Sequence, residues 1–149
     1  MASYVFCRLC DERHDTYAKA FDDLAALVEA DLYYTRHEAP PRIMRRTPMV
    51  GIGSHAGRGL FLLGMCAGLS WEDLGESSLP YRHRIGVIWD GAIYGAEYHE
   101  VFEGVTKYNE RSWTSATRGD YRLVVDRILA GTVLRRIRDA PRLPWDGTP

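Results

Sequence analysis

Glycine recurs through one apolar stretch of this sequence, and its spacing restricts the fold more than any other feature. Apolar residues run from Met49 to Gly53 and from Leu60 to Ala67, and glycine stands at positions 51, 53, 57, 59, 64 and 68. Glycine inside a strand marks a tight bend or a close approach of two backbones. The stretch therefore predicts two curved strands, as in a small β-barrel, joined by a loop over residues 54–59.

Strand and helix patterns flank this stretch. Short β-branched and aromatic runs predict strands at Tyr4–Leu9 and Leu32–Thr35, and helical spacing predicts a helix from about Asp15 to Glu29. Residues 81–89 alternate as a strand does, with Ile85, Val87 and Trp89 on one face.

The C-terminal half predicts a strand around residues 100–102 and a last helix that begins at Thr117 or Asp120 and ends at Leu129. The expected buried stripe of that helix is Leu123, Val124, Ile128 and Leu129. Strand, helix, several strands and helix in this order predict a mixed α/β domain whose curved sheet or barrel is flanked by helices.

The length of 149 residues suits one domain, which we expect over residues 1–140, followed by an irregular tail over 141–149. No apolar run reaches the about 20 residues that a membrane span needs, and the N-terminus lacks a signal-peptide pattern. We therefore expect a cytoplasmic protein with no membrane partner.

Charge is unevenly distributed along a chain whose formal net charge is −1. Residues 11–31 carry seven acids and two basic residues, whereas residues 36–58 carry five arginines and one glutamate. Arginine presents a planar fork that suits phosphates and base edges. A basic face on a neutral protein would explain the pattern, and a solvated arginine-rich loop would explain it equally well.

The sequence lacks the motifs of common catalytic and metal sites. It has no P-loop, dinucleotide fingerprint, nucleophile elbow or H-E-x-x-H helix. Cys7 and Cys10 supply only half of a typical zinc pattern. No defined metal site matches the spacing of Glu97, His99, Glu100 and Glu103. We expect a protein without cofactor or metal that is not an enzyme.

Tryptophan and tyrosine residues gather instead between positions 71 and 113, where seven are interleaved with basic residues. Aromatic rings stack on exposed bases while arginines neutralise phosphates. Ordinary core packing is the alternative for each ring. The seven are Trp71, Tyr81, Trp89, Tyr94, Tyr98, Tyr108 and Trp113.

Several segments together resemble the EVE branch of the PUA-like superfamily, which is close to YTH domains. The opening MASYVFCRL and its helix are similar to the first elements of that family, and HEVFEG and DYRLVVDRIL fit its closing elements. The block PMVGIGSHAGRGLFLLGMCAGLSWEDL, continued by SSLPYRHRIGVIWDG, carries most of the resemblance.

This resemblance implies a small curved β-barrel flanked by helices, with a pocket for a modified base that is flipped out of its strand into an aromatic cage. It implies a non-catalytic reader of modified DNA, with 5-methylcytosine as the favoured base. By position, Trp71 and Tyr81 are cage residues, and Trp89 either floors the pocket or belongs to the core. Asp73 or Asp90 would accept from an exocyclic amine, and Ser54 would add a polar contact.

The arginines expected to contact the phosphate backbone are Arg42, Arg45, Arg46, Arg58, Arg82 and Arg84. Three alternatives remain at this stage. The first is a reader of modified RNA, such as N6-methyladenine. The second is a small nucleotide-processing enzyme that uses Glu97, His99 and Glu100. The third is a regulatory module that binds another protein.

Overall fold

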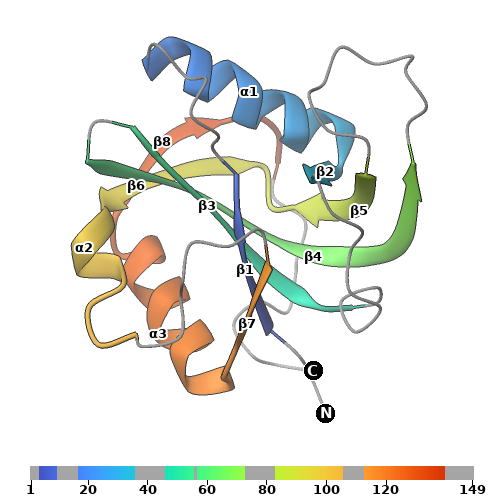
Figure 1. The fold of residues 1–149 in the computed structure, drawn as a ribbon. Coiled ribbons are helices and arrows are strands. Elements are labelled where there is room, and N and C mark those ends of the chain that lie inside the picture. Colours follow the sequence, from blue (N-terminus) through green and yellow to red (C-terminus); the bar gives the residue numbers. More distant parts are fainter. Residues whose placement is uncertain are drawn as a thin grey trace.

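The computed structural model describes residues 4–9, 17–35, 46–55, 57–72, 83–105 and 113–139, which form a sheet-dominated mixed α+β fold (Figure 1). This confirms the predicted mixed class. The elements are β1 (Tyr4–Arg8), α1 (Tyr17–Ala30), β2 (Leu32–Thr35), β3 (Pro48–His55), β4 (Arg58–Glu72), β5 (His83–Trp89), β6 (Ala92–Glu97), α2 (Tyr98–Val101), β7 (Trp113–Ala116), α3 (Arg118–Leu129) and β8 (Thr132–Arg136).

The long strand β4 organises the sheet. Its first residues pair with β6, its second half pairs with β5, and β3 runs antiparallel along it. The main strand order is β2-β5-β4-β3-β1-β7, and β8 joins through β6. Only β1 and β3 are parallel among the described pairs, and no described pairing connects β2 with β7 or β8, so this ladder stays open.

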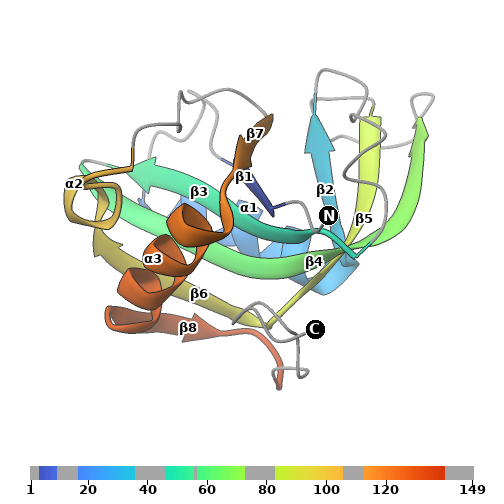
Figure 2. The ribbon, with the colours of Figure 1, turned by 90° about the horizontal axis from the view of Figure 1, so that it is seen from below.

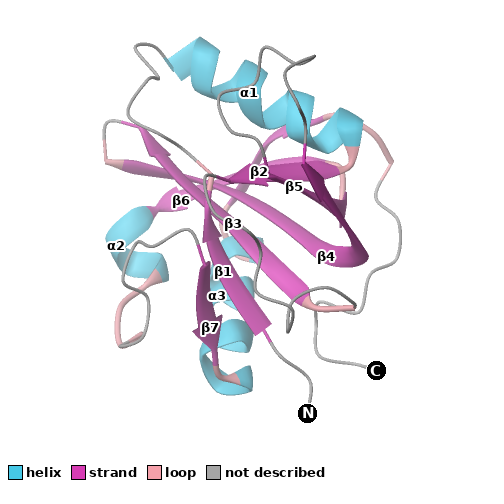
Figure 3. Cartoon of the chain, turned by 45° about the vertical axis from the view of Figure 1, so that its right-hand side comes forward, coloured by secondary structure: helices cyan, strands magenta, loops and turns pink. Residues whose placement is uncertain are grey.

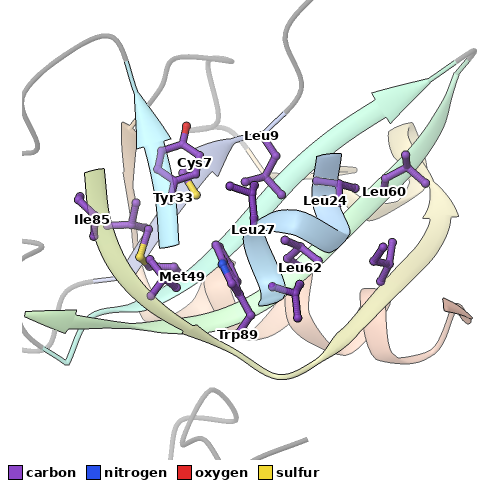
Figure 4. Close-up of a cluster of buried hydrophobic side chains, with 14 of the residues drawn as sticks. Cys7, Leu9, Leu24, Leu27, Tyr33, Met49, Leu60, Leu62, Ile85 and Trp89 are labelled. Atoms are coloured by element: carbon purple, nitrogen blue, oxygen red, sulfur yellow. The ribbon is translucent and has the colours of Figure 1, made fainter. Parts of the chain in front are cut away.

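Two hydrophobic clusters cover the two faces of the sheet. Figures 1 and 3 show α1 on one side and α2 and α3 on the other. Leu24 and Leu27 of α1 face Leu62 and Trp89 of the sheet (Figure 4). On the other face, the buried residues of α3 pack against β-strand residues that include Phe6. The two-sided burial explains why the central strands carry almost continuous apolar runs.

The glycine-rich stretch is a hairpin of two long strands. The expected loop over residues 54–59 is wrong, because Ser54 pairs with Gly59 and His55 pairs with Arg58, which leaves only residues 56 and 57 between the strands. The expected close approach is confirmed at Gly64, where a Cβ atom would lie 2.6 Å from the Trp89 ring and 2.7 Å from the Ile88 carbonyl oxygen. Gly64 therefore lets β4 and β5 pack closely.

The C-terminal half differs from its predicted pattern in two places. Residues 98–101 form the helix α2 instead of a strand, and the strand β6 precedes it. The last helix α3 begins after its predicted cap Thr117, whose Oγ1 accepts from the Asp120 amide. Its buried face nevertheless differs: Leu123 and Leu129 are 37% and 46% exposed. The buried residues are Tyr121, Val124, Val125 and Ile128.

Within the described ranges, no helix has the length and apolar character needed to cross a membrane.

Candidate nucleic-acid interface

Three strands that are far apart in the sequence each have one end at the same place in the sheet. Thr35 at the end of β2 and Glu72 at the end of β4 are both paired with His83, the first residue of β5. Figure 2 shows these strand ends side by side. We call Thr35, Glu72 and His83 the strand-end edge.

The two segments that carried the nucleic-acid hypothesis are attached to this edge. The arginine-rich segment 36–45 follows Thr35 directly, and the segment 73–82 connects Glu72 with His83. Both segments lie outside the described residues. Their attachment points are nevertheless adjacent, which the sequence did not indicate.

A bulge bends β4 shortly before it reaches the strand-end edge. The register with β5 shifts between Cys66 and Ser70, and Gly68 within this interval has φ of 86°, a left-handed value that favours glycine. Bulges turn a strand and change the direction of the side chains that follow. This bulge brings Trp71 and Glu72 back into pairing with β5.

Arg84 lies one residue inside the strand-end edge and is buried, with 3% of its surface exposed. Its Nη1 donates to the carbonyl oxygen of His83 at 3.4 Å. The register places Arg84 opposite Tyr34 of β2 and opposite Trp71 of β4. The backbones of these three residues are therefore neighbours in a row across three strands.

The predicted pocket residues are only partly brought together. Trp71 lies in β4 beside the strand-end edge, whereas Asp73 and Tyr81 lie outside the described residues. Ser54 is exposed near the β3–β4 hairpin, where it pairs with Gly59. The twelve residue-to-residue steps along β4 from Gly59 to Trp71 correspond to about 40 Å of strand. Ser54 is thus at the other end of β4.

Trp89 belongs to the core. It is fully buried in the cluster beneath α1, and its indole Nε1 donates to the carbonyl oxygen of Leu32 at 3.0 Å. This bond ties the end of β5 to the start of β2. Of the two roles considered from the sequence, the structure therefore gives Trp89 the core position.

Asp90 is also fully buried, at the corner where β5 continues into β6. One carboxylate oxygen accepts from the Ala92 amide at 3.1 Å, and the other accepts from the Tyr94 hydroxyl. Burial raises the pKa of Asp90, against the opposing effects of these two hydrogen bonds and of Arg136 and Arg138. The same burial and the Asp90 carboxylate raise the pKa of Tyr94.

The corner is held from outside by Arg138. Its guanidinium binds both carboxylate oxygens of Asp31 and donates to the Trp89 carbonyl oxygen at 3.0 Å. The Ile137 amide donates to the Gly91 carbonyl oxygen at 2.7 Å. These bonds fix the turn after α1, the β5–β6 corner and the end of β8 together, so the polar groups around Asp90 support the fold.

The arginines expected to contact phosphate are dispersed. Arg46, two residues before β3, and Arg58, at the β3–β4 hairpin, are exposed. Arg84 is buried and does not contribute to an exposed basic surface in this conformation. The other three, Arg42, Arg45 and Arg82, lie outside the described residues.

The residues considered for catalysis or metal binding are arranged as follows. The four residues are all exposed, at, within and just after the short helix α2: Glu97, His99, Glu100 and Glu103. Burial raises the pKa of both Cys7 and Cys66, which keeps these thiols protonated at neutral pH. In the part of the chain that the structure describes, no group of three His, Cys, Asp or Glu side chains could hold a metal ion.

Sequence reasoning missed the row of Tyr34, Arg84 and Trp71 and the polar groups around Asp90. Alternation along β5 correctly separated Arg84 from the core face of Ile85, Val87 and Trp89. From the sequence, Arg84 was expected to be exposed, because no local pattern indicates that the face of β5 opposite to Ile85, Val87 and Trp89 is covered there. The burial of Arg84 is a signal that only the structure could give.

Comparison with known proteins gave no match: no family model, no curated protein and no solved structure is similar to this chain.

Proposed function

We propose that this protein is a non-catalytic reader of modified DNA that flips 5-methylcytosine into an aromatic pocket at the strand-end edge. In this proposal the sheet, which is open among the described pairings, corresponds to the barrel of an EVE-like domain of the PUA-like superfamily, and the protein acts in the cytoplasm without a cofactor. The observation that carries the proposal is the pairing of both Thr35 and Glu72 with His83.

This pairing supports the proposal because it joins two chemistries that a base reader needs. The aromatic–acidic segment 73–82 and the arginine-rich segment 36–45 start from neighbouring residues. A pocket beside Trp71 and Tyr81 would supply stacking, and adjacent arginines would hold the phosphates on either side of the flipped nucleotide.

The energies are compatible with modest discrimination. Flipping a base costs a few kcal/mol, and stacking on each aromatic ring returns about 1–3 kcal/mol. One buried methyl group contributes about 0.8 kcal/mol by area and more in a tight pocket. We therefore expect methylated DNA to bind about 10–100-fold more tightly than unmodified DNA.

Fluorescence anisotropy at one fixed salt concentration tests the proposal. The probes are one duplex without modification, the same duplex with 5-methylcytosine, the same duplex with N6-methyladenine, and matched RNA. Trp71→Ala and Tyr81→Ala should each weaken binding to the methylcytosine duplex by about 10–100-fold and remove the preference over unmodified DNA.

Tyr98→Ala is the matched control, because Tyr98 is a half-buried aromatic on α2, at the other end of the molecule (Figure 1). It should keep the wild-type preference. If Trp71→Ala and Tyr81→Ala both preferred methylated duplex as the wild type does, the pocket would be wrongly placed. If the modified RNA bound most tightly, the ligand would be RNA and not DNA. Equal binding to all probes would refute the proposal that the protein reads a modified base.

A further inference from the structure

The arginine-rich segment 36–45 has two described attachments, and they differ in strength. At its far end, the Arg46 amide donates to the Cys66 carbonyl oxygen at 3.1 Å, in the strand β4 that pairs with β3, β5 and β6. At its near end, Thr35 closes β2, which has four residues and pairs only with β5 among the described strands. A short strand with one partner opens more easily than a central strand. Contacts outside the ladder therefore decide how firmly β2 is held.

Such contacts gather at Asp31, the single residue between α1 and β2. Its φ of 52° lies in the left-handed region, which residues other than glycine keep only where surrounding contacts enforce it. The Asp31 amide donates to the Val28 carbonyl oxygen at 3.3 Å, and the Asp31 carbonyl oxygen accepts from the Val87 amide at 3.0 Å. This turn directs the chain from the helix into β2 and against β5.

Arg138 adds a second set of contacts to the same turn. Its guanidinium binds both carboxylate oxygens of Asp31 and donates to the Trp89 carbonyl oxygen at 3.0 Å. The Trp89 indole Nε1 donates in turn to the carbonyl oxygen of Leu32, the first residue of β2. A bidentate pair of arginine and carboxylate fixes the orientation of its two partners. One guanidinium thus holds the start of β2 against the end of β5.

We propose that Asp31 and Arg138 are positioning residues of the nucleic-acid interface, and that their ion pair holds β2 so that the arginine-rich segment leaves the sheet beside His83. This inference rests on the proposed function and deepens it. A duplex that places a base in the pocket and phosphates on the arginines needs both groups at a fixed separation. When that separation is set before binding, less ordering opposes association.

A double-mutant cycle tests whether the pair acts through the arginines. Asp31→Asn removes the charge, and asparagine still tolerates a positive φ. In anisotropy titrations at one salt concentration, this variant should bind the methylcytosine duplex and the unmodified duplex about 3–10-fold more weakly, by the same factor. In a protein that carries Arg42→Ala and Arg45→Ala, it should change binding by less than about twofold. A role in stability alone would weaken binding equally in both backgrounds.

Hydrogen exchange without DNA gives a second readout. Asp31→Asn should raise the exchange rate of β2 and leave that of β3 unchanged. Asp22→Asn is the matched control, because it makes the same change of charge and breaks the Asp22–Arg135 ion pair of 3.8 Å between α1 and β8. This control should leave binding and the exchange of β2 unchanged.

Circular dichroism and thermal melting establish that each variant is folded. Should Asp31→Asn fail to fold, Arg138→Lys decides, because it keeps the charge but loses the fork and should show the same pattern. Wild-type affinity of a folded variant, equal weakening in the two backgrounds, or unchanged exchange of β2 overturns this inference alone. Equal binding of methylated and unmodified duplexes by wild type overturns the proposed function, and the exchange of β2 still decides whether the pair holds the strand.

Discussion

At the scale of single residues, the corner between β5 and β6 depends on a carboxylate that water does not reach. Asp90 is fully buried, and its two oxygens accept from the Ala92 amide and the Tyr94 hydroxyl. Burial of a charge is unfavourable even when the charge is hydrogen-bonded. The raised pKa of Asp90 shows that burial outweighs the stabilisation of the ionised form.

A pH dependence of stability follows from this raised pKa. Because the folded protein binds the proton of Asp90 more tightly than the unfolded chain does, the contribution of Asp90 is most favourable below the unfolded carboxyl pKa of about 3.9. It falls as pH rises through the raised folded pKa, by at most about 1.4 kcal/mol per pH unit. Asp90→Asn removes this titrating group, so the stability of wild type relative to Asp90→Asn should decrease from acidic to neutral pH.

Urea denaturation of both proteins across this pH range measures the difference. Asp126→Asn, at an exposed position of α3, makes the same chemical change and is the matched control. A difference between wild type and Asp90→Asn that increased with pH would contradict the assignment, because it would mean that the fold favours the ionised carboxylate.

At the scale of elements, glycine determines how closely β4 and β5 approach. A Cβ atom on residue 64 would meet the Ile88 carbonyl oxygen at 2.7 Å, and a backbone atom cannot move aside as a flexible side chain can. Gly64→Ala should therefore lower the free energy of unfolding by about 1–3 kcal/mol. Gly119→Ala in α3 meets only Thr117 Oγ1, at 4.0 Å, and should raise it by about 0.5 kcal/mol.

Chemical denaturation of the two alanine variants measures both free energies of unfolding. It tests the expected decrease for Gly64→Ala and the expected increase for Gly119→Ala with the same kind of substitution. A Gly64→Ala variant as stable as wild type would mean that the strands separate at little cost, and the close approach would then not be a constraint on the fold.

The local sequence patterns predicted most helices and strands. They did not predict which face of each element is buried, because tertiary contacts decide that. Periodicity placed α3, yet its apolar residues define two overlapping stripes, and only packing against the sheet decides that Tyr121 and Val125 are buried while Leu129 is exposed. Beyond Gly68, pairing with β5 keeps Trp71 and Glu72 in β4, although glycine and acidic residues are uncommon in strands. The row across Tyr34, Arg84 and Trp71 depends on such pairings and so had no local signal.

At the scale of the whole molecule, the proposed function needs a basic region on a chain whose formal net charge is −1, and residues 36–58 carry five arginines and one glutamate. The arginine-rich segment 36–45 is attached to the strand-end edge, and Arg46 follows it two residues before β3. Figures 1 and 2 show α3 away from that edge. A duplex bound at the edge would contact the arginine-rich segment without requiring contact with α3.

Substitution of Arg42, Arg45 and Arg46 by alanine tests this arrangement. Phosphate contacts carry no sequence information, so the triple variant should bind methylated and unmodified DNA more weakly by the same factor. It should also flatten the plot of log binding constant against log salt by about one unit for each arginine that no longer neutralises a phosphate. The matched control replaces Arg118, Arg122 and Arg135, which are exposed on α3 and β8, and should change the slope far less. Weaker binding of methylated DNA alone, or equal slopes for the two triple variants, would contradict a phosphate role, because counterion release depends on the number of neutralised phosphates and not on the base in the pocket.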